Sequence, residues 1–113
     1  MSPDLPLTIG VEEEYLLVDP VTRDLAVDPP DAILQDCESL IGKGCGMVSP
    51  EFLRAQLEVG TPVCRSISEA RARVDNLRSC VAEAAEKHGL RPIAASTHPF
   101  AEWSIQRHTD KDR

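Results

Sequence analysis

The alternation of apolar and polar positions predicts four extended segments and two helices along the chain. Residues 7–18 are mostly apolar but contain three consecutive glutamates, and apolar runs bounded by turn formers are typical of strands. The turn-rich segment 19–24 follows, and residues 25–27 are predicted to return as the second arm of a hairpin. A further extended segment is predicted over about 47–63, and a last strand over 90–97.

Two segments carry apolar residues at helical spacing. The first is predicted to start near 28–31, where prolines and acidic residues favour a helix start, and to stop at Gly42. The second, over about 67–88, follows the capping-box pair Ser66 and Glu69. Its core-facing stripe is predicted to comprise Ile67, Ala70, Val74, Leu77, Val81, Ala84 and His88. The predicted exposed face comprises Glu69, Arg71, Arg73, Asp75, Arg78 and Glu86.

The order of these elements, β-β-α-β-α-β, favours an α+β fold with an antiparallel sheet that helices cover on one face. The chain has 113 residues, which is about one small domain. Its net charge of −7 argues against nucleic acid as the main partner, because phosphate neutralisation needs clustered cations. The oligomeric state cannot be predicted from these features.

The sequence contains no apolar run near the roughly 20 residues of a membrane-spanning helix, and its first residues do not resemble a signal peptide. A cytoplasmic protein without a membrane partner is therefore expected. The four cysteines, Cys37, Cys45, Cys64 and Cys80, lack zinc-finger spacing. We expect them to be free thiols, with a disulfide or zinc site as the alternative.

Three glutamates interrupt the apolar segment 7–18, where buried carboxylates would be costly. Because successive side chains of a strand alternate faces, Glu12 and Glu14 share one face and Glu13 points to the other. Two carboxylates on one strand face can bind a divalent cation such as Mg²⁺, which prefers oxygen ligands. The alternative is an edge strand with a solvated acidic face.

A second acidic position has the same two-residue spacing. Gln56 and Glu58 share a face of the extended segment 47–63, and they would meet Glu12 and Glu14 if the first and third strands pair. Three carboxylates and one amide would suit Mg²⁺ that holds nucleotide phosphates. Alternatively, Glu58 lies at a sheet edge and has no such role.

Three blocks of the chain resemble the bacterial carboxylate–amine ligases of the glutamate–cysteine ligase type 2 family. They are Ile9-Gly10-Val11-Glu12-Glu13-Glu14-Tyr15-Leu16-Leu17-Val18-Asp19, Gln56-Leu57-Glu58-Val59-Gly60-Thr61-Pro62 and Ala95-Ser96-Thr97-His98-Pro99-Phe100-Ala101-Glu102-Trp103. The blocks follow the family's order, and the resemblance covers residues 7–103.

The resemblance implies a fold similar to the glutamine synthetase catalytic domain and an ATP-dependent ligation through an acyl-phosphate. Such an enzyme acts on small molecules, with ATP as a substrate and Mg²⁺ as cofactor, and its usual product leads to glutathione. By resemblance, Glu12, Glu14 and Glu58 are metal ligands, and no side chain has a catalytic role. Thr97 and His98 are expected near the active site without an assigned role, and a loop-capping histidine is the alternative for His98.

Family members are considerably longer than this chain, and no P-loop or G-x-G-x-x-G signature is present. Residues 1–113 are therefore expected to be the incomplete N-terminal portion of a single ligase catalytic domain, inactive by itself. Which carboxylate and amine are joined stays open. One alternative is a non-catalytic acidic fragment that binds metal or a partner chain. Another is a hydrolase with paired carboxylates as general acid and base, which would not need ATP.

Overall fold

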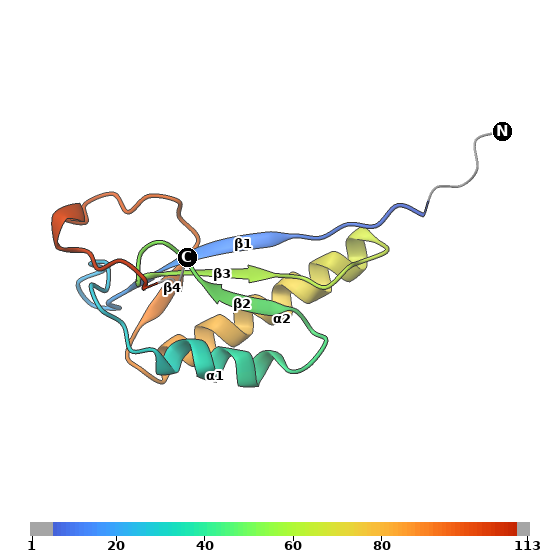
Figure 1. Cartoon of the computed structure of the whole chain (residues 1–113), viewed down its shortest axis with the longest axis horizontal. Helices are drawn as coiled ribbons and strands as arrows, with labels where there is room; N and C mark the ends of the chain where they lie inside the picture. Colours follow the sequence, from blue (N-terminus) through green and yellow to red (C-terminus); the bar gives the residue numbers. More distant parts are fainter. Residues whose placement is uncertain (1–5, 111–113) are drawn as a thin grey trace.

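A four-stranded antiparallel sheet with two helices on one face forms the body of the protein (Figure 1). The computed structural model describes residues 6–110. Its elements are β1 (Glu12–Val18), α1 (Ala32–Ile41), β2 (Met47–Pro50), β3 (Gln56–Gly60), α2 (Ile67–Glu86), β4 (Arg91–Ile93) and the 3₁₀ turn η1 (Trp103–Ile105). The predicted α+β fold, with its antiparallel sheet and helices on one face, is confirmed.

The strand order is β2-β3-β1-β4, so that β1 lies in the interior of the sheet. On one side β1 pairs with β3, with Glu14 opposite Glu58 and Leu16 opposite Gln56. On its other side β1 pairs with β4, with Leu16 opposite Ile93. β1 is thus paired on both sides from Leu16 to Val18, whereas in the described residues its three glutamates pair with β3 alone.

Both faces of β1 are buried in its second half, because the chain covers the sheet on two sides. Tyr15 and Leu17 pack with α1 and α2 in the larger core. Leu16 and Val18 point to the other side, where they form a smaller apolar cluster with Leu25 and Ala55. Figure 1 shows the segment after β4, coloured orange to red, arching over this second side. The first half of β1 therefore has its outer face left open.

The predicted second hairpin arm at 25–27 is present, but it is limited to a single antiparallel bridge. Only Leu25 makes a bridge, to Val18, while the N–H of Ala26 donates to the carbonyl of Leu17 at 2.9 Å. Two prolines follow shortly afterwards, at 29 and 30, and proline has no N–H with which to continue a ladder. The arm therefore ends after one bridge.

The predicted extended segment 47–63 is not one strand but two, β2 and β3, which pair with each other. A turn separates them, in which the N–H of Gln56 donates to the carbonyl of Leu53 at 2.9 Å. The last strand is also shorter than the predicted 90–97, because β4 comprises only Arg91–Ile93.

The long helix α2 follows the sequence pattern closely but not at its ends. The Ser66 hydroxyl accepts the N–H of Glu69 at 3.1 Å, as a capping box requires. Ile67, predicted to be in the core, is 76% exposed, because α2 begins beyond the ends of the strands (Figure 1). The helix ends at Glu86, and His88 instead lies 2.9 Å from the Asp36 carboxylate on α1.

The polar tail pairs with the turn between β2 and β3. The N–H of Arg54 donates to the carbonyl of Arg107 at 2.8 Å, and the N–H of Thr109 donates to the carbonyl of Phe52 at 2.9 Å. The Phe52 and His108 rings are 4.5 Å apart at their centroids. Residues 111–113 of the tail lie outside the described part.

The four cysteines are free thiols, as predicted. Burial is the main cause that raises the pKa of Cys37 to about 12, which keeps this thiol protonated and unreactive. Within residues 6–110, no helix is both long and apolar enough to cross a membrane.

Candidate metal-binding site

Glu12, Glu14 and Glu58 lie on the same face of the sheet. Residues that pair directly across two strands point the same way, and Glu14 is the partner of Glu58. Glu12, two residues earlier on β1, shares this face and pairs with Gly60, which has no side chain to fill the space. This face is the one opposite the helices. The geometry expected from the sequence is therefore present, while the role of these residues as metal ligands stays a prediction.

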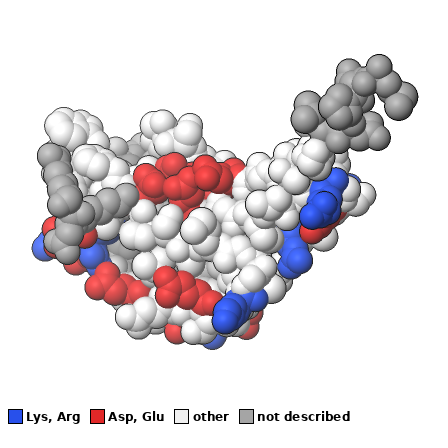
Figure 2. Space-filling model, turned by 45° about the vertical axis from the view of Figure 1, so that its right-hand side comes forward, with Lys and Arg blue, Asp and Glu red and all other residues white. Residues whose placement is uncertain are grey.

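The carboxylates on this face crowd one another. A hydrogen bond shared with Glu51, loss of hydration and the charge of Glu12 raise the pKa of Glu58 above its ordinary value of 4.5. Glu51 was not singled out from the sequence, because its approach to Glu58 depends on the turn between β2 and β3. Figure 2 shows acidic side chains gathered on the upper side of the molecule, the side on which β1 runs in Figure 1.

The donor chemistry of this face fits a hard cation. Carboxylate oxygens are the ligands that Mg²⁺ prefers, and a bound cation would relieve the repulsion that Glu58 experiences. Within the described residues, however, no group of three His, Cys, Asp or Glu side chains is close enough to hold a metal. Residues 6–110 thus offer carboxylates for part of a metal site rather than a closed one.

Glu13 points to the helix face, as its position in the strand predicts, and there it is neutralised. The Arg78 guanidinium donates from Nε to Oε1 at 2.7 Å and from Nη2 to Oε2 at 2.8 Å. The Tyr15 hydroxyl donates to Oε1 at 3.0 Å. The bond from Arg78 holds the pKa of Glu13 below its ordinary value, whereas burial, reinforced by Glu13, raises the pKa of Tyr15 to about 12. Both oxygens of Glu13 are therefore used inside the fold.

Gln56 lies beside Glu14 on the open face. Its side-chain Nε2 donates to Glu14 Oε1 at 2.8 Å, and its Oε1 accepts the N–H of Leu53 at 2.9 Å. Gln56 was predicted as a fourth metal ligand, but its side-chain oxygen is turned toward the backbone N–H of Leu53, which it accepts. The structure instead makes Gln56 a neighbour of a candidate ligand.

His98 organises a loop near the opposite end of β1. Its Nε2 donates to the carbonyl of Arg23 at 2.7 Å, and its Nδ1 accepts the N–H of Phe100 at 3.2 Å. This pattern requires a neutral ring with the proton on Nε2. Since Arg23 follows the end of β1, about 20 Å of strand separates this loop from Glu12. The exposed His98 thus lies beside the turn after β1, and no hydrogen bond or ion pair within residues 6–110 joins Thr97 or His98 to Glu12, Glu14 or Glu58.

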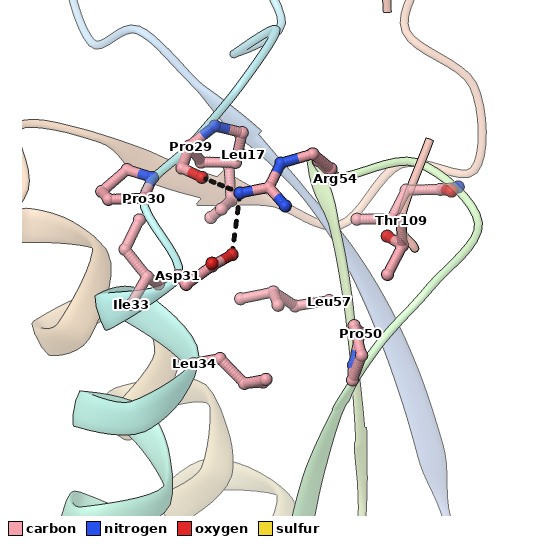
Figure 3. A pocket seen from close by; sticks show the side chains of 11 residues that line it. Leu17, Pro29, Pro30, Asp31, Ile33, Leu34, Pro50, Arg54, Leu57 and Thr109 are labelled. Carbon is pink, nitrogen blue, oxygen red and sulfur yellow. Dashed lines mark hydrogen bonds and ion pairs between the residues drawn. The ribbon is translucent and has the colours of Figure 1, made fainter. Parts of the chain in front are cut away.

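The small pocket in Figure 3 lies on the helix side of the sheet, away from the carboxylates. Leu17, Leu57 and Ile33 supply its apolar wall. Arg54 closes it by bonding to the Asp31 carboxylate at 2.7 Å, to the carbonyl of Pro29 at 3.0 Å and to Asp28. A volume of about 50 Å³ is far below the several hundred Å³ of a typical ligand pocket. Arg54 is close in sequence to Glu58, but its guanidinium joins the turn between β2 and β3 to the segment before α1.

Comparison with known proteins extends the resemblance found in the sequence. The model of the family described as "Glutamate-cysteine ligase family 2 (GCS2)" matches residues 8–113. The chain therefore belongs to this family.

Relatives in several bacteria bear the name "Putative glutamate--cysteine ligase 2". One from Jannaschia sp. is 56% identical over 110 residues, which is 97% of this chain and 28% of that protein. One from Rhodospirillum rubrum is 55% identical over 94% of this chain and 28% of its own length. One from Paracoccus denitrificans is 44% identical over 100% of this chain and 29% of its own length. The chain thus spans a little more than a quarter of the relatives it matches.

Proposed function

We propose that this chain is the N-terminal portion of an ATP-dependent carboxylate–amine ligase of the glutamate–cysteine ligase type, acting in the cytoplasm. Glu12, Glu14 and Glu58 would bind the Mg²⁺ that accompanies ATP. The observation that carries this proposal is the pairing of Glu14 with Glu58, with Glu12 on the same open face, in a chain of this family. Thr97 and His98 are retained as residues near the complete active site, which other parts of the polypeptide would have to form.

The proposed chemistry has two steps. A carboxylate oxygen of the first substrate attacks the γ-phosphorus of ATP, and the bond to ADP breaks to give an acyl-phosphate. The amine of the second substrate then attacks the acyl carbon, forms the amide and expels phosphate. Bound Mg²⁺ neutralises triphosphate charge and aligns it for in-line transfer.

The residues of this chain would hold and position rather than react. Glu12, Glu14 and Glu58 supply oxygen ligands, and Glu14 is further held by Gln56. The pair of Glu13 and Arg78 fixes β1 on α2, so that the alternation of the strand turns its two neighbouring carboxylates outward. No side chain here is assigned as nucleophile, acid or base.

The proposal is tested in a chimera that carries residues 1–113 in place of the corresponding part of the Jannaschia relative. We expect ADP formation that depends on glutamate, cysteine and Mg²⁺. Glu12→Gln should largely abolish it, because the amide keeps the shape of the side chain but loses the charge that Mg²⁺ needs. Glu86→Gln, an exposed change on α2, is the matched control and should leave the rate unchanged. Near-normal turnover of the Glu12→Gln chimera with an unchanged Mg²⁺ requirement would contradict the metal assignment.

A further inference from the structure

The Gln56 side chain is bound at both of its polar ends. Its Oε1 accepts from the backbone N–H of Leu53 at 2.9 Å, and its Nε2 donates to Glu14 Oε1 at 2.8 Å. The backbone N–H of Gln56 also donates to the carbonyl of Leu53 at 2.9 Å, which closes the same short turn. Gln56 therefore makes two hydrogen bonds to Leu53, one with its side chain and one with its backbone, and these bonds fix the position of the Gln56 side chain.

These partners also decide which end of the amide faces Glu14. Amide oxygen and nitrogen have nearly the same shape, and only the hydrogen-bond partners distinguish them. A backbone N–H can only donate, so the atom that faces Leu53 must be the oxygen. The NH₂ group must then face the Glu14 carboxylate, which accepts. The oxygen of Gln56 is consequently directed to the backbone rather than to a cation.

We propose that Gln56 is a positioning residue for Glu14, holding its Oε1 so that its Oε2 is presented to the divalent cation. This inference rests on the proposed function, in which Glu14 is a metal ligand. Residues that hold a metal ligand through a hydrogen bond orient it and tune its affinity for the metal. Gln56 is thus the link between the turn at 53–56 and the ligand geometry on β1.

A neutral partner is the appropriate one for this task. On the helix face, Arg78 binds both oxygens of Glu13 and compensates its negative charge. Gln56 binds a single oxygen of Glu14 and leaves its negative charge intact. A cationic side chain at position 56 would repel the metal that Glu14 is proposed to bind.

The test is binding of Mn²⁺, as a probe for Mg²⁺, to the chimera that carries residues 1–113 in the Jannaschia relative, here called the wild type, measured from the loss of the electron paramagnetic resonance signal of free Mn²⁺. We expect Gln56→Met to weaken binding about tenfold, the loss typical when the residue behind a metal ligand is removed. Gln35→Met makes the same chemical change at an exposed position of α1 and should bind like the wild type. The variants Glu12→Gln and Glu14→Gln test whether these two carboxylates bind the cation.

The outcomes separate the inference from the function on which it rests. If Glu12→Gln and Glu14→Gln weaken binding but Gln56→Met does not, the positioning role is wrong and the metal site stands. If the ligand variants bind like the wild type, or the wild type binds no Mn²⁺, the metal assignment is wrong and the inference falls with it.

A second measurement covers the case in which Gln56→Met does not fold. In the wild-type chain, titration with Mg²⁺ should shift the side-chain amide proton signals of Gln56 in the nuclear magnetic resonance spectrum. The Glu14→Gln variant should lose this response, while the backbone signal of Leu53 should stay in place in both chains. A role limited to closing the turn would leave the Gln56 amide signals unchanged by Mg²⁺, and that result would overturn the proposal.

Discussion

Arg78 of α2 holds Glu13 of β1 through two parallel hydrogen bonds of 2.7 and 2.8 Å, from Nε to Oε1 and from Nη2 to Oε2. This pair holds α2 against β1 at Glu13, between Glu12 and Glu14, whose carboxylates point to the opposite face of the sheet. The three consecutive glutamates thus have different tasks, because Glu13 is a structural residue and its two neighbours are candidates for metal binding. Such two-point pairs combine charge attraction with a fixed geometry.

Glu13→Gln should destabilise the chain at neutral pH. The folded state lowers the pKa of Glu13 below its ordinary value of 4.5, so the carboxylate stabilises the fold above that pH. This contribution is lost as the pH falls through the lowered pKa, because the protonated side chain no longer binds Arg78 as an anion.

Urea unfolding of both chains across the acidic range checks this expectation. The gap between the two unfolding midpoints should be largest at neutral pH and should close below pH 4.5. Glu86→Gln serves as a control, since Glu86 is exposed on the same helix. A gap that does not change with pH would show that the charge of Glu13 is not what stabilises the pair.

Glu58→Gln should have the opposite effect on stability. The pKa of Glu58 is raised above 4.5, so in the window above that value the folded chain binds more protons than the unfolded chain. Stability therefore falls as the pH rises through the raised pKa. At neutral pH the variant should unfold at higher urea concentration than the wild type, and the two should converge below pH 4.5. A variant less stable than the wild type at neutral pH would contradict the crowding of carboxylates on this face.

Gly46→Ala should be more damaging than Gly44→Ala, although both glycines have positive φ. A Cβ at Gly46 would lie 2.7 Å from the carbonyl oxygen of Gly60 and 2.9 Å from Leu77 Cδ2, whereas nothing lies within 4 Å at Gly44. Positive φ costs an alanine about 1 kcal/mol at Gly44, where φ is +80°, and more at Gly46, where φ is +132°. Overpacking should cost Gly46→Ala about 1–3 kcal/mol more of the free energy of unfolding. Equal losses in calorimetry or urea unfolding would show that the loop moves to accept the methyl group.

The chain of 113 residues should show no ATP-dependent ligation. Phosphoryl transfer needs donors around the triphosphate, and in the described residues Arg54 is bound to Asp28 and Asp31 while Arg78 is bound to Glu13. The measurement is phosphate release from ATP in the presence of Mg²⁺, glutamate and cysteine. Sustained turnover that disappears in a Glu12→Gln variant would show that these residues suffice for an active site.

The parts of the fold that follow from local patterns could be predicted. The capping residue Ser66, the positions Ala70 to Ala84 of the buried stripe and the alternation of faces along β1 depend only on spacing. Ile67 has the same spacing but is exposed, because burial also requires another element alongside it. The split of 47–63 into two strands follows Pro50, at which β2 ends, and this proline was a signal in the sequence that the predicted single segment ignored.

The candidate site, like the fold, could be predicted only where it depends on spacing along the chain. Spacing places Glu12 and Glu14 on one face, but their approach to Glu58 required the pairing of distant strands, which a single sequence does not reveal. The orientation of the Gln56 amide depends on the N–H of Leu53, and the place of His98 depends on the turn after β1. Hydrogen bonds between segments far apart in sequence decide these details, and neither composition nor periodicity encodes them.

The interior position of β1 in the sheet has a consequence for the order in which the molecule is made. β1 leaves the ribosome before its partners β3 and β4, which end at Gly60 and Ile93. An apolar strand in that situation has both of its hydrogen-bonding edges exposed while most of the chain is still being translated, and exposed edges invite pairing with other chains. Three adjacent negative charges repel the same segment of a neighbouring nascent chain. Charges within an apolar strand are the kind of sequence feature that opposes such aggregation, and we expect Glu12, Glu13 and Glu14 to have this effect before any of them has a partner.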